Sequence, residues 1–279
     1  MAEPFLGSEA VTAGIATHSQ LRRRYTRVFR DVYVNEGTEM TPALRAHAAW
    51  LWSRRRGTIA GFSAAALHGS KWIEATRAVD IIHDNRHPAP GLQIWGDRIA
   101  NDEIEKIHGV PVTTGVRTAL DLACWYPLTT SVAALDALAR VTELKPVDVE
   151  PLLSRYRGRR GIESARVALD LVDAGAQSPK ETWLRLVLVR AGLPRPRTQI
   201  PVCDEFGDVI AYLDMGWDDI KVGVEYDGEQ HRRDRGQYSW DVRRLERVER
   251  HGWILVRVLA GDRPAEIVRR VRGARARRM

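Results

Sequence analysis

The sequence predicts a multidomain protein of mixed α+β and α/β class, and three observations support this prediction. The chain has 279 residues, more than one domain of ordinary size requires. Stretches with helical periodicity alternate with β-like stretches along the chain. The stretch from Ala211 to His231 (AYLDMGWDDIKVGVEYDGEQH) alternates as a β-hairpin does, with Trp217-Asp218-Asp219 at the bend. We expect three domains, over residues 1–40, 41–176 and 177–279.

The composition favours a polyanionic partner. The net charge is +7 and the pI is about 9.7, a balance that sets non-specific attraction and association rate rather than fold. The two cysteines, Cys124 and Cys203, lie outside any C-x-x-C pattern, so we expect neither a zinc knuckle nor a disulfide framework. No signal peptide or run of about 18 apolar residues is visible, which predicts a cytoplasmic protein without a membrane partner.

Residues 8–34 read as a short helix-turn-helix followed by a strand. Ser8 is a cap for a helix to about Ala13, and Thr17 or Ser19 caps a second helix, HSQLRRRY, which runs into the β-like VFRDVYV. This pattern resembles the winged-helix start of AbiEi-type antitoxin proteins. The resemblance implies that the second helix enters the DNA major groove. The alternative is a capping domain with a solvated basic face. The residues that would contact DNA are Arg22, Arg23, Arg24 and Arg27.

The middle of the chain reads as a mixed α/β connecting region. Thr41 caps a helix through about Arg55, and another helix covers Ser63 to His68. Three β-like segments follow (VDIIH, LQIWG and IEKIHGVPVTT). Next come a helix with Thr113 or Thr114 near its cap and helices over 128–139 and 146–156. Residues 41–70 also resemble the antitoxin-type region, in which the tryptophans pack in the core. A basic link follows, which either contacts phosphates or is a solvated connector; it contains Arg157, Arg159 and Arg160.

Two acids occupy strand positions where a buried sheet normally places apolar side chains. These are Asp214 and Glu225, one on each strand of the predicted hairpin. Carboxylates are seldom buried unless they are paired or bound to a cation. Two that converge from neighbouring strands indicate a site for a hard cation of the Mg²⁺ type. The other reading is that both acids end their strands in solvent.

Five motifs between Ser178 and Val258 occur in the order found in one nuclease group. They are SPKETWLRLVLVRAGLP, YLDMGW, VGVEYDGEQH, Asp241-x-x-Arg244 and HGWILVRV. The segment resembles the domains grouped with very-short-patch-repair (Vsr) endonucleases in the PD-(D/E)xK superfamily. The resemblance implies a restriction-endonuclease-like α/β domain with a central mixed sheet.

The resemblance also assigns roles to individual residues. Asp214 and Glu225 would bind one Mg²⁺ or Mn²⁺ ion with the Tyr226 carbonyl, and the ion would activate a water molecule. Glu181 would either bond a metal-bound water or only satisfy its own helix start, where it forms a capping box with Ser178. Asp227 stands where most members of the superfamily keep a lysine, so the usual cation is missing there.

His231 is the candidate for the missing cation or for the general acid. Asp241 would hold His231 or Arg244 in place from behind the site, although a plain surface pair between Asp241 and Arg244 explains the spacing equally well. The surrounding arginines predict a groove that follows the phosphates of DNA. They are Arg232, Arg233, Arg235, Arg243 and Arg247.

Two functions follow from these patterns. The first is a Mg²⁺-dependent DNA endonuclease of repair or defence type with an N-terminal DNA-targeting module. The alternative is an antitoxin-like, non-catalytic transcriptional regulator that keeps the nuclease fold as a scaffold, and a cognate toxin or a repair protein is the implied protein partner. Carboxylates of Asp214 and Glu225 that reach one ion favour the nuclease. An arginine bridged into that space favours the regulator.

Overall fold

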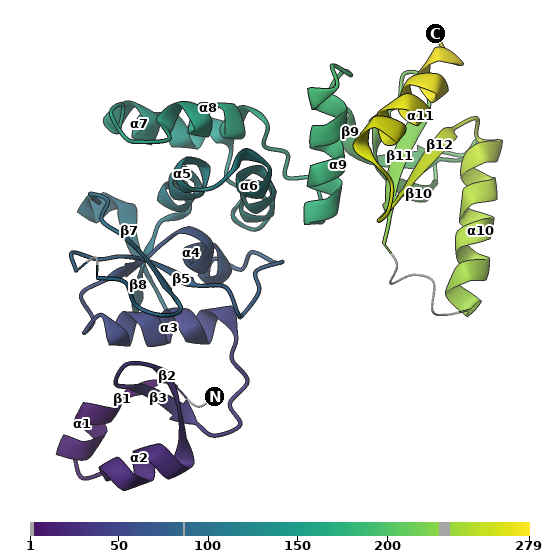
Figure 1. Cartoon of the computed structure of the whole chain (residues 1–279). Helices are drawn as coiled ribbons and strands as arrows, with labels where there is room; N and C mark the ends of the chain where they lie inside the picture. Colours follow the sequence, from purple (N-terminus) through teal and green to yellow (C-terminus); the bar gives the residue numbers. More distant parts are fainter. Residues whose placement is uncertain (1–2, 86, 229–234) are drawn as a thin grey trace. The chain divides into compact units, whose positions relative to one another are not determined.

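The structure is a computed structural model that describes residues 3–85, 87–228 and 235–279, with residues 235–242 described for their backbone alone. The chain divides into two compact units, Met1–Val172 and Asp173–Met279 (Figure 1). Each unit has hydrophobic clusters of its own. The mixed elements of the two units confirm the predicted multidomain α+β class. In the part of the chain that the structure describes, no helix is long and apolar enough to cross a membrane.

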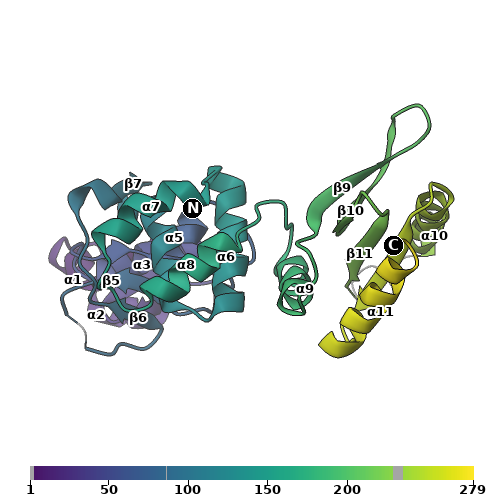
Figure 2. The same cartoon turned by 90° about the horizontal axis from the view of Figure 1, so that it is seen from above.

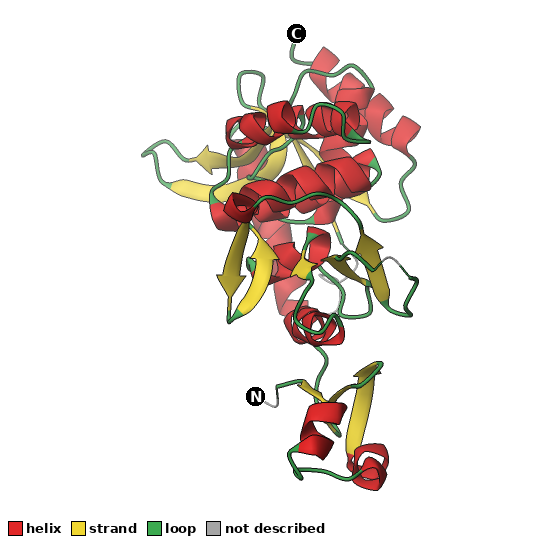
Figure 3. Ribbon diagram, turned by 90° about the vertical axis from the view of Figure 1, so that its left-hand side faces the viewer, coloured by secondary structure: helices red, strands yellow, loops and turns green. Residues whose placement is uncertain are grey.

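The first unit begins with two short helices beside a small antiparallel sheet (Figure 3). Thr17 caps the second helix in a capping box with Gln20, as predicted. Ser8 does not cap the first helix, which begins after Leu6. The Oδ1 atom of Asp31 instead accepts the Ser8 N–H at 2.9 Å, so a residue distant in sequence satisfies this helix start. The elements are β1 (Phe5–Leu6), α1 (Gly7–Thr12), α2 (His18–Arg24), β2 (Tyr25–Phe29) and β3 (Val32–Asn35).

The rest of this unit surrounds a five-stranded mixed sheet of order β6-β5-β4-β8-β7. Thr41 and Thr114 cap α3 and α5 as predicted. Leu6, Phe29 and Val32 of the N-terminal module share one hydrophobic cluster with α3 and the sheet. The elements are α3 (Pro42–Trp52), β4 (Thr58–Ile59), α4 (Gly61–Leu67), β5 (Val79–Ile82), β6 (Leu92–Trp95), η1 (Asn101–Glu103), β7 (Ile104–Ile107), β8 (Val110–Thr113), α5 (Gly115–Trp125), α6 (Leu128–Thr142), α7 (Pro146–Arg155) and α8 (Ile162–Asp170).

The second unit is a four-stranded mixed sheet of order β12-β11-β10-β9 between helices. Helices α9 and α11 cover one face and α10 covers the other (Figure 1). The predicted hairpin is confirmed as the antiparallel pair β10 and β11, which are the two inner strands, while β11 and β12 run parallel. The elements are α9 (Pro179–Arg190), β9 (Arg197–Cys203), β10 (Val209–Trp217), β11 (Val222–Asp227), α10 (Arg235–Arg250), β12 (Ile254–Leu259) and α11 (Pro264–Ala276).

The two inner strands approach each other closely at a pair of glycines. Gly216 and Gly223 face each other across β10 and β11. A Cβ atom on Gly216 would lie 2.2 Å from the Val222 carbonyl oxygen, which no side chain tolerates. This close approach lies two residues from each acid, Asp214 and Glu225. The loop between β9 and β10 projects beyond the sheet (Figure 2).

Candidate functional site

Glu181 lies in the first turn of α9, and its side chain is buried. Its backbone N–H donates to the Ser178 Oγ atom at 3.2 Å, which is the predicted cap. Its Oε2 atom accepts the Gln177 N–H at 2.8 Å, one residue before the position that a capping box uses. Glu181 thus satisfies its own helix start, as one of the two predicted readings requires.

Asp214 stands where the β10–β11 ladder ends. Its Oδ2 atom accepts the Tyr226 backbone N–H at 2.8 Å. The pKa of the Asp214 carboxyl is raised to about 7, chiefly by burial and also by the negative charges of Glu181 and Glu225, against the lowering effects of the Tyr226 N–H and Arg244. The charges of Glu181 on α9 and Glu225 on β11 are therefore close enough to Asp214 to influence its pKa.

Glu225 is 7% exposed, and a guanidinium compensates its charge. Arg244 on α10 donates from Nη1 to Oε1 at 2.8 Å and from Nη2 to Oε2 at 2.7 Å. This bidentate geometry is the strongest form of an arginine–carboxylate pair. The bonds described for Arg244 go to Glu225, whereas the predicted partner Asp241 has its side chain outside the described residues.

Asp227, at the position of the superfamily lysine, is paired across the sheet. The Arg257 Nη2 atom on β12 donates to its Oδ2 atom at 2.5 Å. A cation therefore reaches this position from the neighbouring parallel strand, which the sequence analysis did not identify. In the β11–β12 register Arg257 lies opposite Glu225, two residues before Asp227. That register cannot be read from the sequence.

The remaining predicted residues of this site divide into two groups. His231, Arg232 and Arg233 lie outside the described residues, as does the side chain of Arg235. Arg243 and Arg247 are exposed on α10. Of the arginines predicted to form a groove, only Arg243 and Arg247 have described side chains.

The donor atoms at this site are of the chemical type that binds a divalent cation. Asp214, Glu225 and the Tyr226 carbonyl are hard oxygen donors, and a strand residue presents its N–H and its C=O to the same neighbour, which places the Tyr226 carbonyl on the Asp214 side. Arg244 uses one lone pair of each Glu225 oxygen, so a second remains on each. Within the described ranges, however, no three His, Cys, Asp or Glu side chains are grouped closely enough to hold a metal by themselves.

The N-terminal module presents an uncompensated basic surface. Arg22, Arg23 and Arg24 are exposed on α2, and Arg27 is exposed on β2. Leu21 on the same helix is 3% exposed and packs with Ala10 and Ala16, so α2 turns its arginines outward. Among residues 3–85, 87–228 and 235–279, none of these four arginines forms an ion pair. We call Arg22, Arg23, Arg24 and Arg27 the α2 arginine cluster.

The basic link at 157–160 is only partly available to a ligand. Arg159 is largely buried, donates to Asp121 at 2.7 Å and forms an ion pair with Asp97 in which Nε and Oδ1 are 2.9 Å apart. The hypothesis of a phosphate contact is wrong for Arg159, because Asp121 and Asp97 already use its charge. Arg157 and Arg160 are exposed.

Comparisons with known proteins place the chain beside two uncharacterized proteins. MT2308 and Rv2248, from two strains of Mycobacterium tuberculosis (CDC 1551 / Oshkosh and H37Rv), are each 26% identical over 236 residues, covering 85% of this chain and 86% of the relative. The solved structure of the RV2827C protein of Mycobacterium tuberculosis matches with a TM-score of 0.42 and 15% identity, covering 72% of this chain and 84% of that chain. No protein-family model matches the chain.

Proposed function

We propose that the protein binds double-stranded DNA through its N-terminal module and acts as a regulator, with the C-terminal unit as a non-catalytic scaffold. The single observation that carries this proposal is the α2 arginine cluster. Its cations are exposed and lack an acid partner among the described residues. Cations of this kind release counterions from DNA when they neutralise phosphates, and this release supplies most of non-specific affinity.

The shape of the module supports the same reading. The seven-residue helix α2 is about 10 Å long at about 1.5 Å per residue, and a major groove about 12 Å wide accepts a helix of this size. The β2–β3 hairpin follows α2 directly, as the wing follows the recognition helix in a winged-helix protein, and Arg27 belongs to it. We therefore infer that α2 enters the groove and that Arg27 contacts the adjacent backbone.

The Arg244 bridge favours a regulator over a nuclease. Both oxygens of Glu225 accept hydrogen bonds from Arg244, and the lysine position is an aspartate whose charge is balanced by Arg257. A nuclease needs its carboxylates for a cation and a free cationic group for the transition state. In this site the cations and the acids compensate one another.

The test of DNA binding is fluorescence anisotropy with a labelled duplex. Replacing Arg22, Arg23 and Arg24 together by alanine should weaken binding at least tenfold. Arg166→Ala is the matched control, because Arg166 is exposed on α8 and far along the chain from α2. Equal affinity of the triple variant and the wild-type protein would show that DNA does not bind at α2.

A second candidate, the metal-dependent DNA endonuclease, is favoured by one specific observation. The pKa of Asp214 rises to about 7, chiefly because the carboxyl is buried and also because of the charges of Glu181 and Glu225, and perturbed carboxyls of this kind occur at catalytic sites. Asp214, Glu225 and the Tyr226 carbonyl would hold Mg²⁺ or Mn²⁺, which when bound supplies a Lewis acid and lowers the pKa of a bound water. Glu181 would position polar groups beside Asp214, and Arg257 would lie close to a bound phosphate.

A DNA-cleavage assay distinguishes the two candidate functions. Supercoiled, linear, mismatched and single-stranded DNA would be incubated with Mg²⁺, Mn²⁺ or EDTA and with wild-type protein or Asp214→Asn. Cleavage that requires the metal and disappears in Asp214→Asn would establish the nuclease. Intact DNA under every metal condition, together with retained binding, would establish the regulator.

A further inference from the structure

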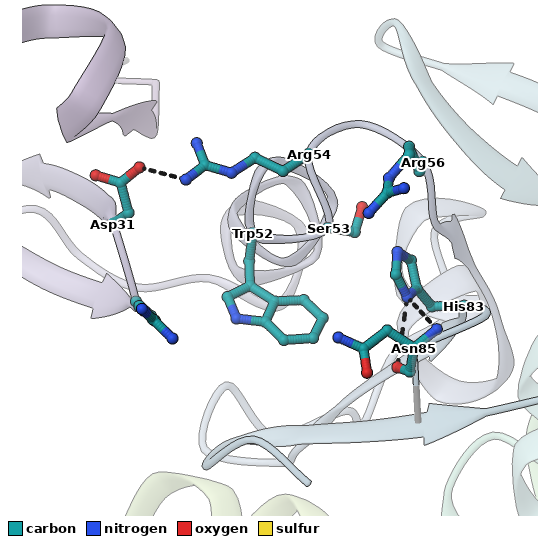
Figure 4. Close-up of a pocket in the computed structure, with 8 residues that line it drawn as sticks. Asp31, Trp52, Ser53, Arg54, Arg56, His83 and Asn85 are labelled. Carbon is teal, nitrogen blue, oxygen red and sulfur yellow. Dashed lines mark hydrogen bonds and ion pairs between the residues drawn. The ribbon is translucent and has the colours of Figure 1, made fainter. Parts of the chain in front are cut away.

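A cavity of about 280 Å³ lies inside the first unit, where the β2–β3 turn, the loop after α3 and the end of β5 meet (Figure 4). Its lining is rich in arginine and contains one acid, Asp31. Arg54 forms an ion pair with Asp31, with 2.9 Å between Nη2 and Oδ2, and so compensates the negative charge of that acid. Arg30 and Arg56 line the same cavity and have no ion pair or hydrogen-bond partner for their guanidinium groups within the described residues. The cavity therefore carries a net positive charge.

The loop that carries Arg56 is held rigidly. The Ser53 Oγ atom accepts the Gly57 N–H at 2.9 Å and donates to the Trp50 carbonyl at 2.6 Å. Arg54 and Arg55 are consecutive non-glycine residues in the left-handed region, with φ of 56° and 61°. Strained backbone of this kind persists where the surroundings fix it, and it gathers at ligand sites.

The other wall of the cavity is aromatic and polar. The Trp52 ring is half-buried, and its centroid lies 6.1 Å from that of His83. The His83 Nδ1 atom accepts the Asn85 N–H at 2.9 Å, so the neutral ring carries its proton on Nε2 and offers a donor there (Figure 4). The exposed Asn85 amide adds a further donor and acceptor. A flat ring next to such groups suits a heterocyclic base.

We infer that this cavity binds one nucleotide, with the phosphate between Arg30 and Arg56 and the base against Trp52. Arginine forks match phosphate oxygens in geometry and charge. The volume is near the lower limit of small-molecule pockets, about 300 Å³, which leaves room for one nucleotide and excludes a duplex. The phosphorylated base can come from a free nucleotide or from the 5′ end of a single strand. The site is separate from the α2 arginine cluster, so it stands independently of the proposed DNA contact.

Isothermal titration calorimetry of the full chain tests the inference. The probes are the four common nucleoside 5′-monophosphates, adenosine, inorganic phosphate, and a short single strand with and without a 5′-phosphate. We expect saturable binding of at least one monophosphate with a Kd below about 1 mM, and no binding of adenosine. Stronger binding of the 5′-phosphorylated strand than of any mononucleotide would identify the strand end as the source, and the reverse order would identify the free nucleotide.

The variants separate this site from others. Arg56→Gln and Arg30→Gln change exposed side chains, so the fold is retained, and each should weaken binding at least tenfold. Trp52→Ala should weaken the binding of the nucleotide and leave the binding of inorganic phosphate unchanged. Arg98→Gln, an exposed arginine outside both the cavity and the α2 arginine cluster, is the matched control and should bind as the wild type does. Absence of saturable binding by every phosphate probe, or equal binding by Arg56→Gln and wild type, would overturn the inference.

Discussion

Arg244 compensates the carboxylate of Glu225 in the second unit. Its bridge to Glu225 is buried, with side-chain exposures of 18% and 9%. Removing one partner of a buried pair leaves an uncompensated charge and typically costs about 3–5 kcal/mol. Arg244→Ala should lower the free energy of unfolding by this amount in urea denaturation.

The control for this prediction is Arg250→Ala on the same helix. Arg250 and Glu246 form an i,i+4 pair at 3.4 Å with both side chains mostly exposed, so its loss should cost under about 0.5 kcal/mol. If Arg244→Ala were as stable as Arg250→Ala, the bridge to Glu225 would contribute little, and the argument for a compensated site would lose its basis.

Asp214 makes stability depend on pH in a known direction. Its pKa is raised from 3.8 in the unfolded chain to about 7, so the folded protein binds more protons between these values and the free energy of unfolding falls as pH rises through this window. Asp214→Asn removes the titration and keeps an acceptor for the Tyr226 N–H. Relative to wild type, the variant should gain about 2.6 kcal/mol of stability between pH 5 and pH 8, because about two pH units of this window lie between the unfolded and the folded pKa.

The measurement is urea unfolding of both proteins at pH 5 and at pH 8. Asp219→Asn, an exposed change in the turn before β11, should show no such pH-dependent difference. A difference between Asp214→Asn and wild type that stays constant from pH 5 to pH 8 would contradict the raised pKa.

The sequence could predict which acids gather but not which cations meet them. Asp214 and Glu225 interrupt apolar strand patterns, and Glu181 follows a cap, so local patterns point to all three. Arg244 and Arg257 reach their acids through the packing of α10 and the β11–β12 register. Such contacts depend on tertiary structure, which a single sequence does not contain.

At the scale of elements, Gly161 controls the entry into α8. Its φ is +86°, and a Cβ atom would lie 2.3 Å from the Cys124 carbonyl oxygen. Gly161→Ala should therefore destabilise the protein by more than about 2 kcal/mol, from backbone strain and from the clash together. Thermal unfolding measures the loss.

Gly158 in the same link provides the comparison. A Cβ atom there would meet nothing within 4 Å, so Gly158→Ala should be neutral or stabilising by up to about 1 kcal/mol. Equal stability of the two alanine variants would show that the turn before α8 tolerates a side chain.

Helices and strands with a local signal could be predicted, and those with a distant partner could not. The caps at Thr17, Thr41 and Ser178 were identified from residue type and spacing. The start of α1 was missed because Asp31 satisfies it across the fold. Strand β9 was missed as well, because it is defined mainly by its ladder with β10.

At the scale of the whole molecule, the two units should unfold independently. Their hydrophobic clusters are built from separate sets of residues, on the two sides of the Val172–Asp173 boundary. We expect differential scanning calorimetry to give two transitions, of which Arg244→Ala lowers one. A single transition that shifts as a whole would show that the units unfold as one.

The most direct test of the central claim is the salt dependence of duplex DNA affinity. For a protein that neutralises phosphates with the α2 arginine cluster, the logarithm of affinity falls linearly with the logarithm of salt concentration, with about 0.9 of slope for each phosphate neutralised. Replacing Arg22, Arg23 and Arg24 by alanine should reduce the slope by about two to three and leave the weaker binding less sensitive to salt. An unchanged slope in this variant would contradict DNA recognition by α2.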